Sequence, residues 1–325
     1  MGNMVDGVWH AEGLFKSDEK GSFQRPDSGF RDWVTADGEP GPDGQTGHRA
    51  EGGRYHLYVS YACPWAHRTM IVRALKGLES MIDLSVVDPL MRDDGWTFAT
   101  ERGGTGDPLH GSDYLWQLYA RAREGYTGKV TVPVLWDKAR DTIVSNESAE
   151  IIRMFNAAFD GLGALDGDFY PADLRDEIDA VNAAAYDRVN NGVYKCGFAK
   201  TQAAYDEAVA PLFAELDRLD ERLTGREWLV GDRMTEADIR LFTTLVRFDA
   251  VYHGHFKCNV RRVQDYPALE GLLERMLAIP AIADTVHLDH IKTHYYASHL
   301  ELNPTGIVPA GPDLPWAGLV RPSYS

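Results

Sequence analysis

A strand–helix–strand pattern over residues 54–87 constrains the fold of this chain more than any other feature. Residues 54–60 alternate at period two and are rich in aromatic and β-branched side chains, which predicts a strand. After Cys63, apolar side chains recur at helical spacing, and Gly77 is a suitable stop. Residues 82–87 predict a second strand. A strand, a helix and a strand in this order form a βαβ unit, so we expect an α/β domain here.

The segments around this unit complete the predicted α/β domain. Residues 131–136 and 142–144 predict a third and a fourth strand, and a helix is expected from residue 147 to about 158, capped by the preceding Ser-Asn pair. Residues 88–128 read as an insertion with one short helix near residues 114–123. Residues 1–53 are rich in Gly, Asp, Glu and Pro, which predicts an irregular arm.

Beyond about residue 165 the strand signals fade and amphipathic helical patterns replace them. The expected helices cover about 173–190, 202–223, 236–252, 267–278 and 282–298. The predicted organisation is an arm (1–53), an α/β domain (54–165), an all-helical domain (166–302) and a proline-containing tail (303–325).

Composition excludes several classes of partner. The formal net charge of −16 disfavours binding to nucleic acid and to anionic lipid. No run of 18 apolar residues predicts a membrane-spanning helix, and the polar first twenty residues do not resemble a secretory signal. The three cysteines are widely spaced, so we expect no disulfide framework, no structural zinc and a reducing cytoplasmic setting.

Cys63 carries the sharpest chemical signal. It follows a predicted strand and precedes Pro64, which is favoured in the first turn of a helix. Free backbone N–H groups and the helix dipole at such a position stabilise a thiolate, so we predict that Cys63 is a nucleophile; the alternative is a buried structural cysteine. Residue 66 is Ala, so no CxxC pair can resolve an intermediate on Cys63. A second thiol would have to arrive as a small molecule.

Two further features suggest a site for a peptide-like ligand. A cis bond between Val132 and Pro133 would expose the Val132 backbone to an extended ligand, although an ordinary trans edge-strand proline is the alternative. Glu147 and Ser148 lie in the first turn of a predicted helix, where Glu147 suits an ammonium group and Ser148 suits a carboxylate. Helix capping alone explains the second pair equally well.

Taken together, these features resemble the glutathione-transferase superfamily, which has a cis-proline, a Glu-Ser pair and a following helical domain. Residues 235–238 (TEAD) are similar to the helix-capping box of that superfamily, with Thr235 as the cap and Asp238 bonding back to it. The resemblance implies an α/β thioredoxin-like N-terminal domain plus an all-α C-terminal domain, the glutathione-transferase superfold. Residues 54–165 would then bind glutathione, and residues 166–302 would form an aromatic-substrate pocket.

The resemblance is most specific to the glutathionyl-hydroquinone reductases, also called Xi-class glutathione transferases, and extends from about residue 30 to residue 310. The segments that carry it are residues 61–68 (YACPWAHR), 131–137 (TVPVLWD), 190–194 (NNGVY) and 303–306 (NPTG). The positions that match glutathione-binding residues of the family are Cys63, Trp96, Val132, Glu147 and Ser148, and those that match quinol-binding residues are Tyr194, Tyr252 and Tyr295. Lys129 is a departure, because relatives often have Arg there; a lysine keeps the charge but lacks the planar fork that binds a carboxylate.

The resemblance implies glutathione-dependent reduction of S-glutathionyl-hydroquinones through a Cys63–glutathione mixed disulfide, resolved by a second glutathione. Glutathione, or another low-molecular-weight thiol in a host that lacks it, would be the cosubstrate, and the protein would be a homodimer. The alternatives are an Omega-like thioltransferase or dehydroascorbate reductase and, ranked lower, a non-catalytic binding protein of the same fold.

Three histidines on the last predicted helix, His287, His290 and His294, share one face. A metal site is conceivable there, but neither cysteine ligands nor a zinc-protease arrangement accompany them, so polar surface histidines are the favoured interpretation and no metal is expected. Tyr295 on the same helix could also be a core aromatic.

Overall fold

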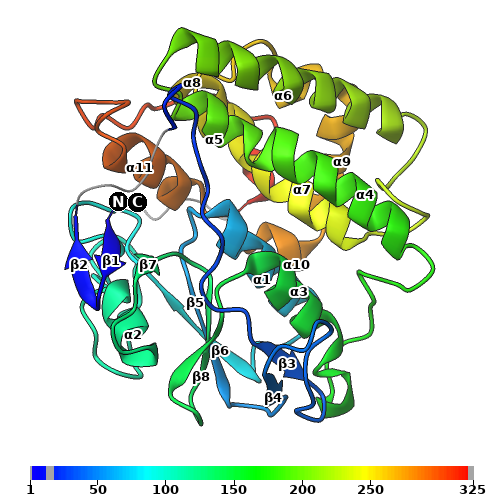
Figure 1. Cartoon of the computed structure of the whole chain (residues 1–325). Coiled ribbons are helices and arrows are strands. Elements are labelled where there is room, and N and C mark those ends of the chain that lie inside the picture. Colours follow the sequence, from blue (N-terminus) through cyan, green and yellow to red (C-terminus); the bar gives the residue numbers. More distant parts are fainter. Residues whose placement is uncertain (1, 12–17, 321–325) are drawn as a thin grey trace. The chain divides into compact units, whose positions relative to one another are not determined.

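The computed structural model describes residues 2–11 and 18–320, which form two compact units. One, the α/β unit, comprises residues 2–11 and 26–168, and the other, the helical unit, comprises residues 18–25 and 169–320 of this described part. The α/β unit contains a four-stranded sheet in the order β6-β5-β8-β9 (Figure 1). The strands of this sheet are β5 (Tyr55–Val59), β6 (Ile82–Val86), β8 (Val134–Asp137) and β9 (Thr142–Ser145).

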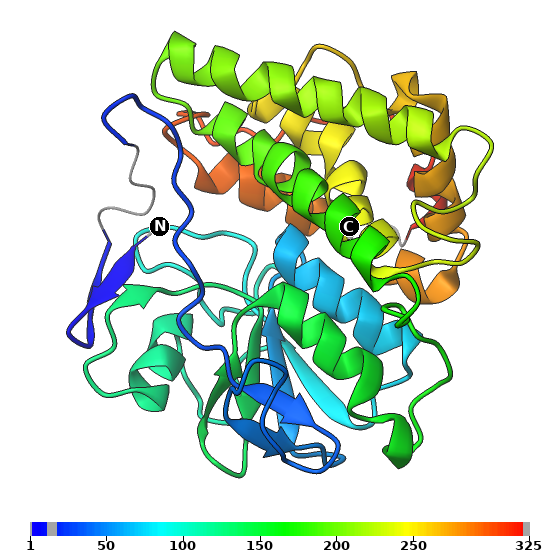
Figure 2. The same cartoon turned by 45° about the vertical axis from the view of Figure 1, so that its right-hand side comes forward.

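The pairing within this sheet confirms the predicted βαβ unit. Strand β5 runs parallel to β6, while β8 is antiparallel to both β5 and β9. The crossover from β5 to β6 is α1 (Pro64–Leu75), which lies side by side with α3 (Ser148–Ala157) (Figure 2). Gly77, with a φ of 62°, follows the end of α1 as expected. Because α1 begins a few residues after β5 ends, Cys63 lies at the carboxyl end of a central strand.

The N-terminal residues are less irregular than predicted. They contain β1 (Asn3–Val5), β2 (Val8–His10), β3 (Trp33–Thr35) and β4 (Gly47–Arg49). Strand β1 pairs with β2 in a hairpin and also with β7 (Gly128–Lys129), while β3 and β4 form a separate parallel pair. The helix expected near residues 114–123 is present as α2 (Leu115–Ala122) and packs against β9. Strands of three residues are too short to show an alternation that sequence analysis can detect.

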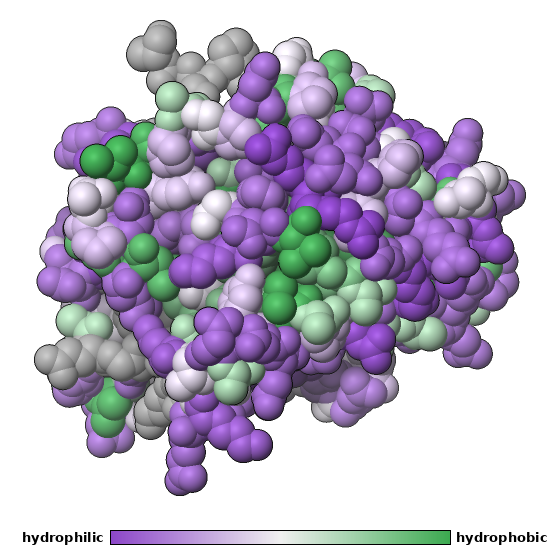
Figure 3. Space-filling model, turned by 90° about the horizontal axis from the view of Figure 1, so that it is seen from above, coloured by the Kyte–Doolittle hydropathy of each residue, from purple (hydrophilic) through white to green (hydrophobic). Residues whose placement is uncertain are grey.

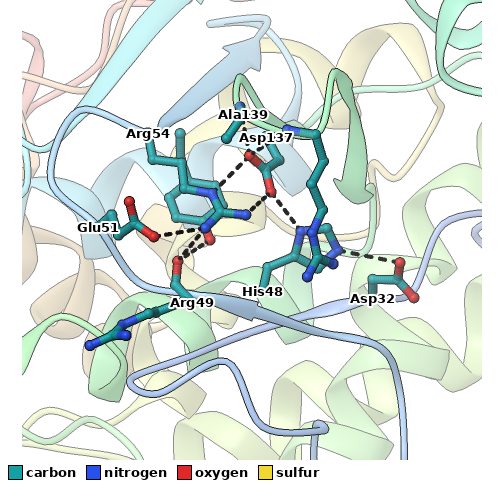
Figure 4. A network of polar contacts seen from close by, with 9 residues as sticks. Asp32, His48, Arg49, Glu51, Arg54, Asp137 and Ala139 are labelled. Carbon is teal, nitrogen blue, oxygen red and sulfur yellow. Dashed lines mark hydrogen bonds and ion pairs between the residues drawn. The ribbon is translucent and has the colours of Figure 1, made fainter.

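A buried polar network fixes β4 to the end of β8 (Figure 4). The His48 Nδ1 donates to Asp137 Oδ2 at 2.7 Å, and its Nε2 lies 3.4 Å from Asp32 Oδ2. The Arg54 guanidinium donates to both carboxylate oxygens of Asp137, at 2.9 and 2.6 Å. Burial alone would raise the pKa of Asp137, but the hydrogen bonds from His48 and Arg54 hold it well below its ordinary range. The ionised carboxylate therefore anchors a segment that was expected to be irregular.

The helical unit confirms the change of pattern after residue 165. Its α-helices are α4 (Arg175–Ala185), α5 (Gly192–Gly197), α6 (Gln202–Leu223), α7 (Glu236–Arg247), α8 (His253–His255), α9 (Pro267–Leu277), α10 (Pro280–Ala283) and α11 (Leu288–Ser298). The single helix predicted over residues 282–298 is wrong: the chain forms α10 and α11 separated by a break at residues 284–287. Sequence analysis also missed α5, which is short and follows closely after a π-helical segment.

Two π-helical segments interrupt the regular helices of this unit. They are Tyr186–Asn190, between α4 and α5, and Phe248–Tyr252, after α7. The Asn190 side chain ties the first segment to α7, because its Nδ2 donates to the Arg240 carbonyl at 3.2 Å and to Thr244 Oγ1 at 2.7 Å. Such π segments are frequent at functional sites, and here they precede Tyr194 and end at Tyr252.

The capping box that was predicted from residues 235–238 is confirmed at the start of α7. The Asp238 Oδ2 accepts a 2.8 Å hydrogen bond from the Thr235 backbone, and Oδ1 accepts one of 2.8 Å from the Leu229 backbone. Burial raises the pKa of Asp238 to about 6, although these hydrogen bonds act in the opposite direction. The box therefore has a carboxyl group that titrates near neutrality.

Hydrophilic side chains cover most of the visible molecular surface. The face in Figure 3 is mostly hydrophilic, with a central group of hydrophobic residues and smaller groups elsewhere on the same face. Among the described residues, no helix combines the length and the apolar character that are needed to cross a membrane.

Candidate active site

Cys63 occupies the position that sequence analysis predicted for it. It is the N-cap residue of α1, with extended backbone angles (φ −77°, ψ 121°), and its side chain is partly exposed. Its carbonyl oxygen accepts the hydrogen bond from the His67 backbone at 3.0 Å. The thiol lies 3.5 Å from the Val132 carbonyl oxygen. The Cys63 sulfur is thus at the positive end of a helix dipole, where a thiolate is stabilised.

The Val132-Pro133 bond is cis, as predicted. A polar network holds the residue that precedes it: Tyr119 Oη donates to the Thr131 carbonyl at 2.8 Å and accepts from the Thr131 backbone at 3.2 Å. The Asn146 amide donates to Tyr119 Oη at 3.1 Å and to Thr131 Oγ1 at 3.2 Å. Burial raises the pKa of Tyr119, so its hydroxyl remains protonated. Sequence analysis missed Tyr119 because only the tertiary fold brings it to this loop.

Glu147 and Ser148 begin α3, with Glu147 as the N-cap residue in place of the predicted Ser145-Asn146 cap. The Glu147 carboxylate accepts from the Ala149 backbone at 3.1 Å and from Ser28 Oγ at 2.9 Å. The Ser148 hydroxyl accepts a 3.5 Å hydrogen bond from Arg68, a buried residue of α1. Both residues therefore have a structural role. The connection through Arg68 links the helix of Cys63 to the helix of Ser148.

Trp96 and Lys129 belong to the same unit. Trp96 is buried, and its carbonyl oxygen accepts from the Leu115 backbone at 2.9 Å at the start of α2. Lys129 lies in β7 opposite Asn3, and its carbonyl oxygen accepts from Tyr126 Oη at 2.9 Å. These contacts fix the two backbones. The binding of glutathione by the two side chains stays a prediction.

In the helical unit, three tyrosines that are far apart in sequence meet through their hydroxyl groups. Tyr194 lies on α5, Tyr252 ends the second π segment, and Tyr295 lies on α11. The Tyr295 hydroxyl is 2.7 Å from that of Tyr194 and 2.8 Å from that of Tyr252. We refer to these three residues as the tyrosine triad. Burial raises the pKa of Tyr252 and of Tyr295 well above the ordinary value, so both remain hydrogen-bond donors.

Two residues near the N-terminus contact the ring of Tyr194. The ring of Phe23 stacks on that of Tyr194 at a centroid distance of 6.2 Å. The Arg25 guanidinium lies 5.0 Å from the centre of the Tyr194 ring, and its Nε donates to Asn191 Oδ1 at 2.7 Å. Sequence analysis missed both residues because they lie in the segment that was predicted to be an irregular arm.

The prediction of surface histidines on the last helix is wrong. His287, His290 and His294 are all buried, because α11 packs into the unit instead of lying on its surface. The His294 ring packs edge-on against that of Tyr295, with the centroids 5.3 Å apart. Among the described residues, no group of three or more His, Cys, Asp or Glu side chains is arranged to hold a metal ion.

The two other cysteines differ from Cys63 in their surroundings. Cys196 and Cys258 are both buried in the helical unit. Burial raises the pKa of the Cys258 thiol well above its ordinary value. Cys63 is the one cysteine of the chain whose side chain is partly exposed.

Both units match domains of a known protein family. Residues 62–158 match the family model of the glutathione S-transferase N-terminal domain, and residues 202–275 match that of the C-terminal domain. The chain is 57% identical over 323 residues to glutathionyl-hydroquinone reductase YqjG of Escherichia coli (strain K12), covering 99% of this chain and 98% of YqjG. It is 54% identical to glutathionyl-hydroquinone reductase PcpF of Sphingobium chlorophenolicum, covering 99% of this chain and 100% of PcpF. The glutathione-bound structure of YqjG superposes with a TM-score of 0.89 at 55% identity, covering 99% of this chain and 98% of that structure.

Proposed function

Because this chain belongs to the glutathionyl-hydroquinone reductases, the Xi class of glutathione transferases, we propose that it reduces S-glutathionyl-hydroquinones to hydroquinones at the expense of glutathione. The observation that carries the proposal is the meeting of the three tyrosine hydroxyls in a chain that also has Cys63 at the start of a helix. A thiol-transfer enzyme for alkyl disulfides needs the cysteine alone. A cluster of phenol donors is needed when the leaving group is an aryl carbon.

The tripeptide part of the substrate would bind in the α/β unit. An extended glutathionyl moiety can pair with the Val132 backbone, and its amino-acid head group suits the carboxylate of Glu147 and the hydroxyl of Ser148 at the N-terminus of α3. Trp96 and Lys129 are the further residues that we assign to glutathione. This arrangement brings the substrate sulfur to Cys63.

The Cys63 thiolate then attacks the sulfur of the substrate, which forms an S–S bond and breaks the bond between that sulfur and the ring carbon. The ring carbon is a poor leaving group unless the electron pair can move to a carbonyl oxygen of the keto tautomer. Hydroxyl groups of the tyrosine triad would stabilise the oxygen as it gains negative charge, in the manner of an oxyanion hole. Protonation of that oxygen gives the hydroquinone.

Resolution of the Cys63–glutathione disulfide requires a second thiol. Residue 66 is Ala, and Cys196 and Cys258 are buried, so the thiol of a second glutathione is the expected reductant. It attacks the glutathionyl sulfur and releases glutathione disulfide and the Cys63 thiolate. The net reaction converts one glutathionyl-hydroquinone and one glutathione into one hydroquinone and one glutathione disulfide.

We further propose a cytoplasmic, homodimeric protein that uses no metal. The absence of CxxC motifs and the buried state of two of its three cysteines suit a reducing compartment. Sedimentation velocity would test the dimer, which a single species with the mass of one chain, 36.2 kDa, would contradict.

Mass spectrometry of the intact protein tests the reaction. After incubation with a glutathionyl-hydroquinone and no free glutathione, the protein should gain the mass of one glutathionyl group on Cys63, and hydroquinone should appear in equal amount. An Omega-like thioltransferase is the second candidate. It would form the same adduct from an alkyl glutathione disulfide but would release no hydroquinone from the aryl thioether.

A further inference from the structure

Arg25 lies over the ring of Tyr194, one member of the tyrosine triad. Its guanidinium lies 5.0 Å from the centre of the Tyr194 ring and 5.5 Å from that of Phe23. The hydrogen bond from its Nε to Asn191 Oδ1, 2.7 Å long, holds the guanidinium at a residue three positions before Tyr194. The side chain is partly buried.

The segment that precedes Arg25 is held in place within the helical unit. The Lys200 backbone donates to the Gly21 carbonyl at 3.0 Å, and Thr201 Oγ1 donates to the Lys20 carbonyl at 2.9 Å. Gly21 has a φ of 85°, and a Cβ there would lie 3.1 Å from the Thr201 methyl carbon. Phe23 stacks on both Tyr194 and Phe198. These contacts keep Arg25 over the Tyr194 ring.

A cation over the face of a phenol ring is attracted to its π electrons, and it also stabilises negative charge that develops on the phenol oxygen. The Tyr194 hydroxyl is hydrogen-bonded to that of Tyr295, so this polarisation extends to a second hydroxyl of the triad. A hydroxyl polarised in this way is a stronger donor to an oxygen that gains charge during a reaction.

We propose that Arg25 is a positioning residue of the proposed reductase, which fixes the Tyr194 ring and strengthens the hydroxyl donors that receive charge from the departing hydroquinone. This inference rests on the proposed function. Arg25 acts through Tyr194, so its contribution should depend on how much help the leaving group needs. Electron-rich hydroquinones, whose oxygen holds charge poorly, should depend on Arg25 more than chlorinated ones.

The test compares Arg25→Gln, Arg25→Lys and a matched control, Arg175→Gln, in the full-length protein. Arg175 also lies 5.0 Å from a tyrosine ring of the helical unit, that of Tyr170, but has no contact with the triad. The rate of hydroquinone release in a single turnover is measured for methyl-, unsubstituted, chloro- and dichloro-glutathionyl-hydroquinones. Deglutathionylation of the mixed disulfide of glutathione and 2-mercaptoethanol is measured in parallel, and thermal unfolding midpoints check that each variant is folded.

For Arg25→Gln we expect a loss of about tenfold with the methyl substrate, a loss of less than about threefold with the dichloro substrate, and no change with the alkyl disulfide. Arg25→Lys should recover part of the loss, because the charge remains but the planar stacking is gone. Arg175→Gln should match the wild type throughout.

If Arg25→Gln lowers the rate equally for all four aryl substrates, or also lowers the rate with the alkyl disulfide, Arg25 only maintains the fold. An Arg25→Gln variant that is as active as the control would also overturn the inference. If Arg25→Gln does not fold, the same comparison is made with Arg25→Lys. A rate of hydroquinone release that depends more steeply on the leaving group than in the wild type supports the inference, and an unchanged dependence overturns it. A wild-type protein that cleaves the alkyl disulfide but none of the aryl substrates would instead overturn the proposed function.

Discussion

The Cys63 thiol and the Val132 carbonyl oxygen lie 3.5 Å apart, which joins the first turn of α1 to the loop that enters β8. Cys63 is the proposed nucleophile, and Val132 is the residue proposed to pair with the peptide backbone of glutathione. If glutathione pairs with Val132 as proposed, its own sulfur should come close to the Cys63 thiol.

Replacement of Cys63 by Ser should abolish the release of hydroquinone. The hydroxyl is a far weaker nucleophile than a thiolate toward sulfur, and loss of a nucleophile typically costs on the order of 10³ or more in turnover. The measurement is steady-state reduction of a glutathionyl-hydroquinone, with the thermal unfolding midpoint as the check on folding. Cys196→Ser is the matched control. A Cys63→Ser variant that keeps most of the activity would refute the mechanism.

Catalysis should require no second cysteine of the chain. Cys196 and Cys258 are buried, and burial raises the pKa of Cys258. In a double variant, Cys196→Ser with Cys258→Ser, turnover should stay within about twofold of the wild type because neither thiol takes part in the exchange. Iodoacetamide should label Cys63 much faster than the other two, as followed by peptide mass spectrometry. A folded double variant with a large loss would reveal a resolving thiol within the chain.

The tyrosine triad should matter for aryl substrates only. Loss of one preorganised donor to a developing oxyanion can cost about 10²–10³ in rate, but three hydroxyls share this load, so each single Tyr→Phe change should cost less. The double variant Tyr194→Phe with Tyr252→Phe should be severely impaired. Release of hydroquinone is compared with cleavage of an alkyl glutathione disulfide, which should persist. Tyr205→Phe is the control, because the Tyr205 hydroxyl donates to the Lys257 carbonyl at 2.7 Å and not to the triad. Equal losses in both reactions would mean that the three tyrosines serve packing alone.

The capping box of α7 should make the stability of the protein depend on pH near neutrality. Burial raises the pKa of Asp238 from 3.8 to about 6 in the folded protein, so the folded state holds a proton there that the unfolded chain has released. The stability that comes from this group is therefore present at low pH and decreases as the pH rises through about 6.

Urea unfolding of the wild type and Asp238→Asn at several pH values measures this effect. The difference in unfolding free energy should move by about 1 kcal/mol in favour of the wild type between pH 8 and pH 5. Asp173→Asn is the control, because the side chain of Asp173 is 72% exposed. A difference that does not change with pH would show that burial does not perturb this carboxyl.

Local sequence patterns were sufficient to predict the elements that depend on residues close together in the sequence. The alternation before Cys63 and the helical spacing after it predicted β5 and α1, and the TEAD segment predicted the cap of α7, because these signals depend on neighbours within one or two turns. The helix predicted over residues 236–252 is regular only to Arg247, since a π segment adds a residue to the turn and breaks the period.

Other parts of the site depend on contacts between distant residues. No pattern in the sequence predicts that Tyr194, Tyr252 and Tyr295 share hydrogen bonds, and their convergence was expected only from a family resemblance. The buried state of His294 could not be predicted either, because a polar residue on an amphipathic helix is usually exposed. No sequence pattern predicted a role for Arg25, because its partners Tyr194 and Asn191 lie in a distant part of the sequence.

Residues 18–25 belong to the helical unit, whereas residues 26–168 belong to the α/β unit. Arg25 is separated from its partner Asn191 by 166 positions. During synthesis, this segment leaves the ribosome long before α5 exists, so the contacts around Tyr194 can form only after the entire α/β unit has been translated. A shortened chain that begins at residue 26 would still contain the residues of the four-stranded sheet and of the described helices, but it would lack the Phe23 and Arg25 contacts. Such an N-terminal deletion would therefore act on the tyrosine triad, whose members are all encoded in the second half of the gene.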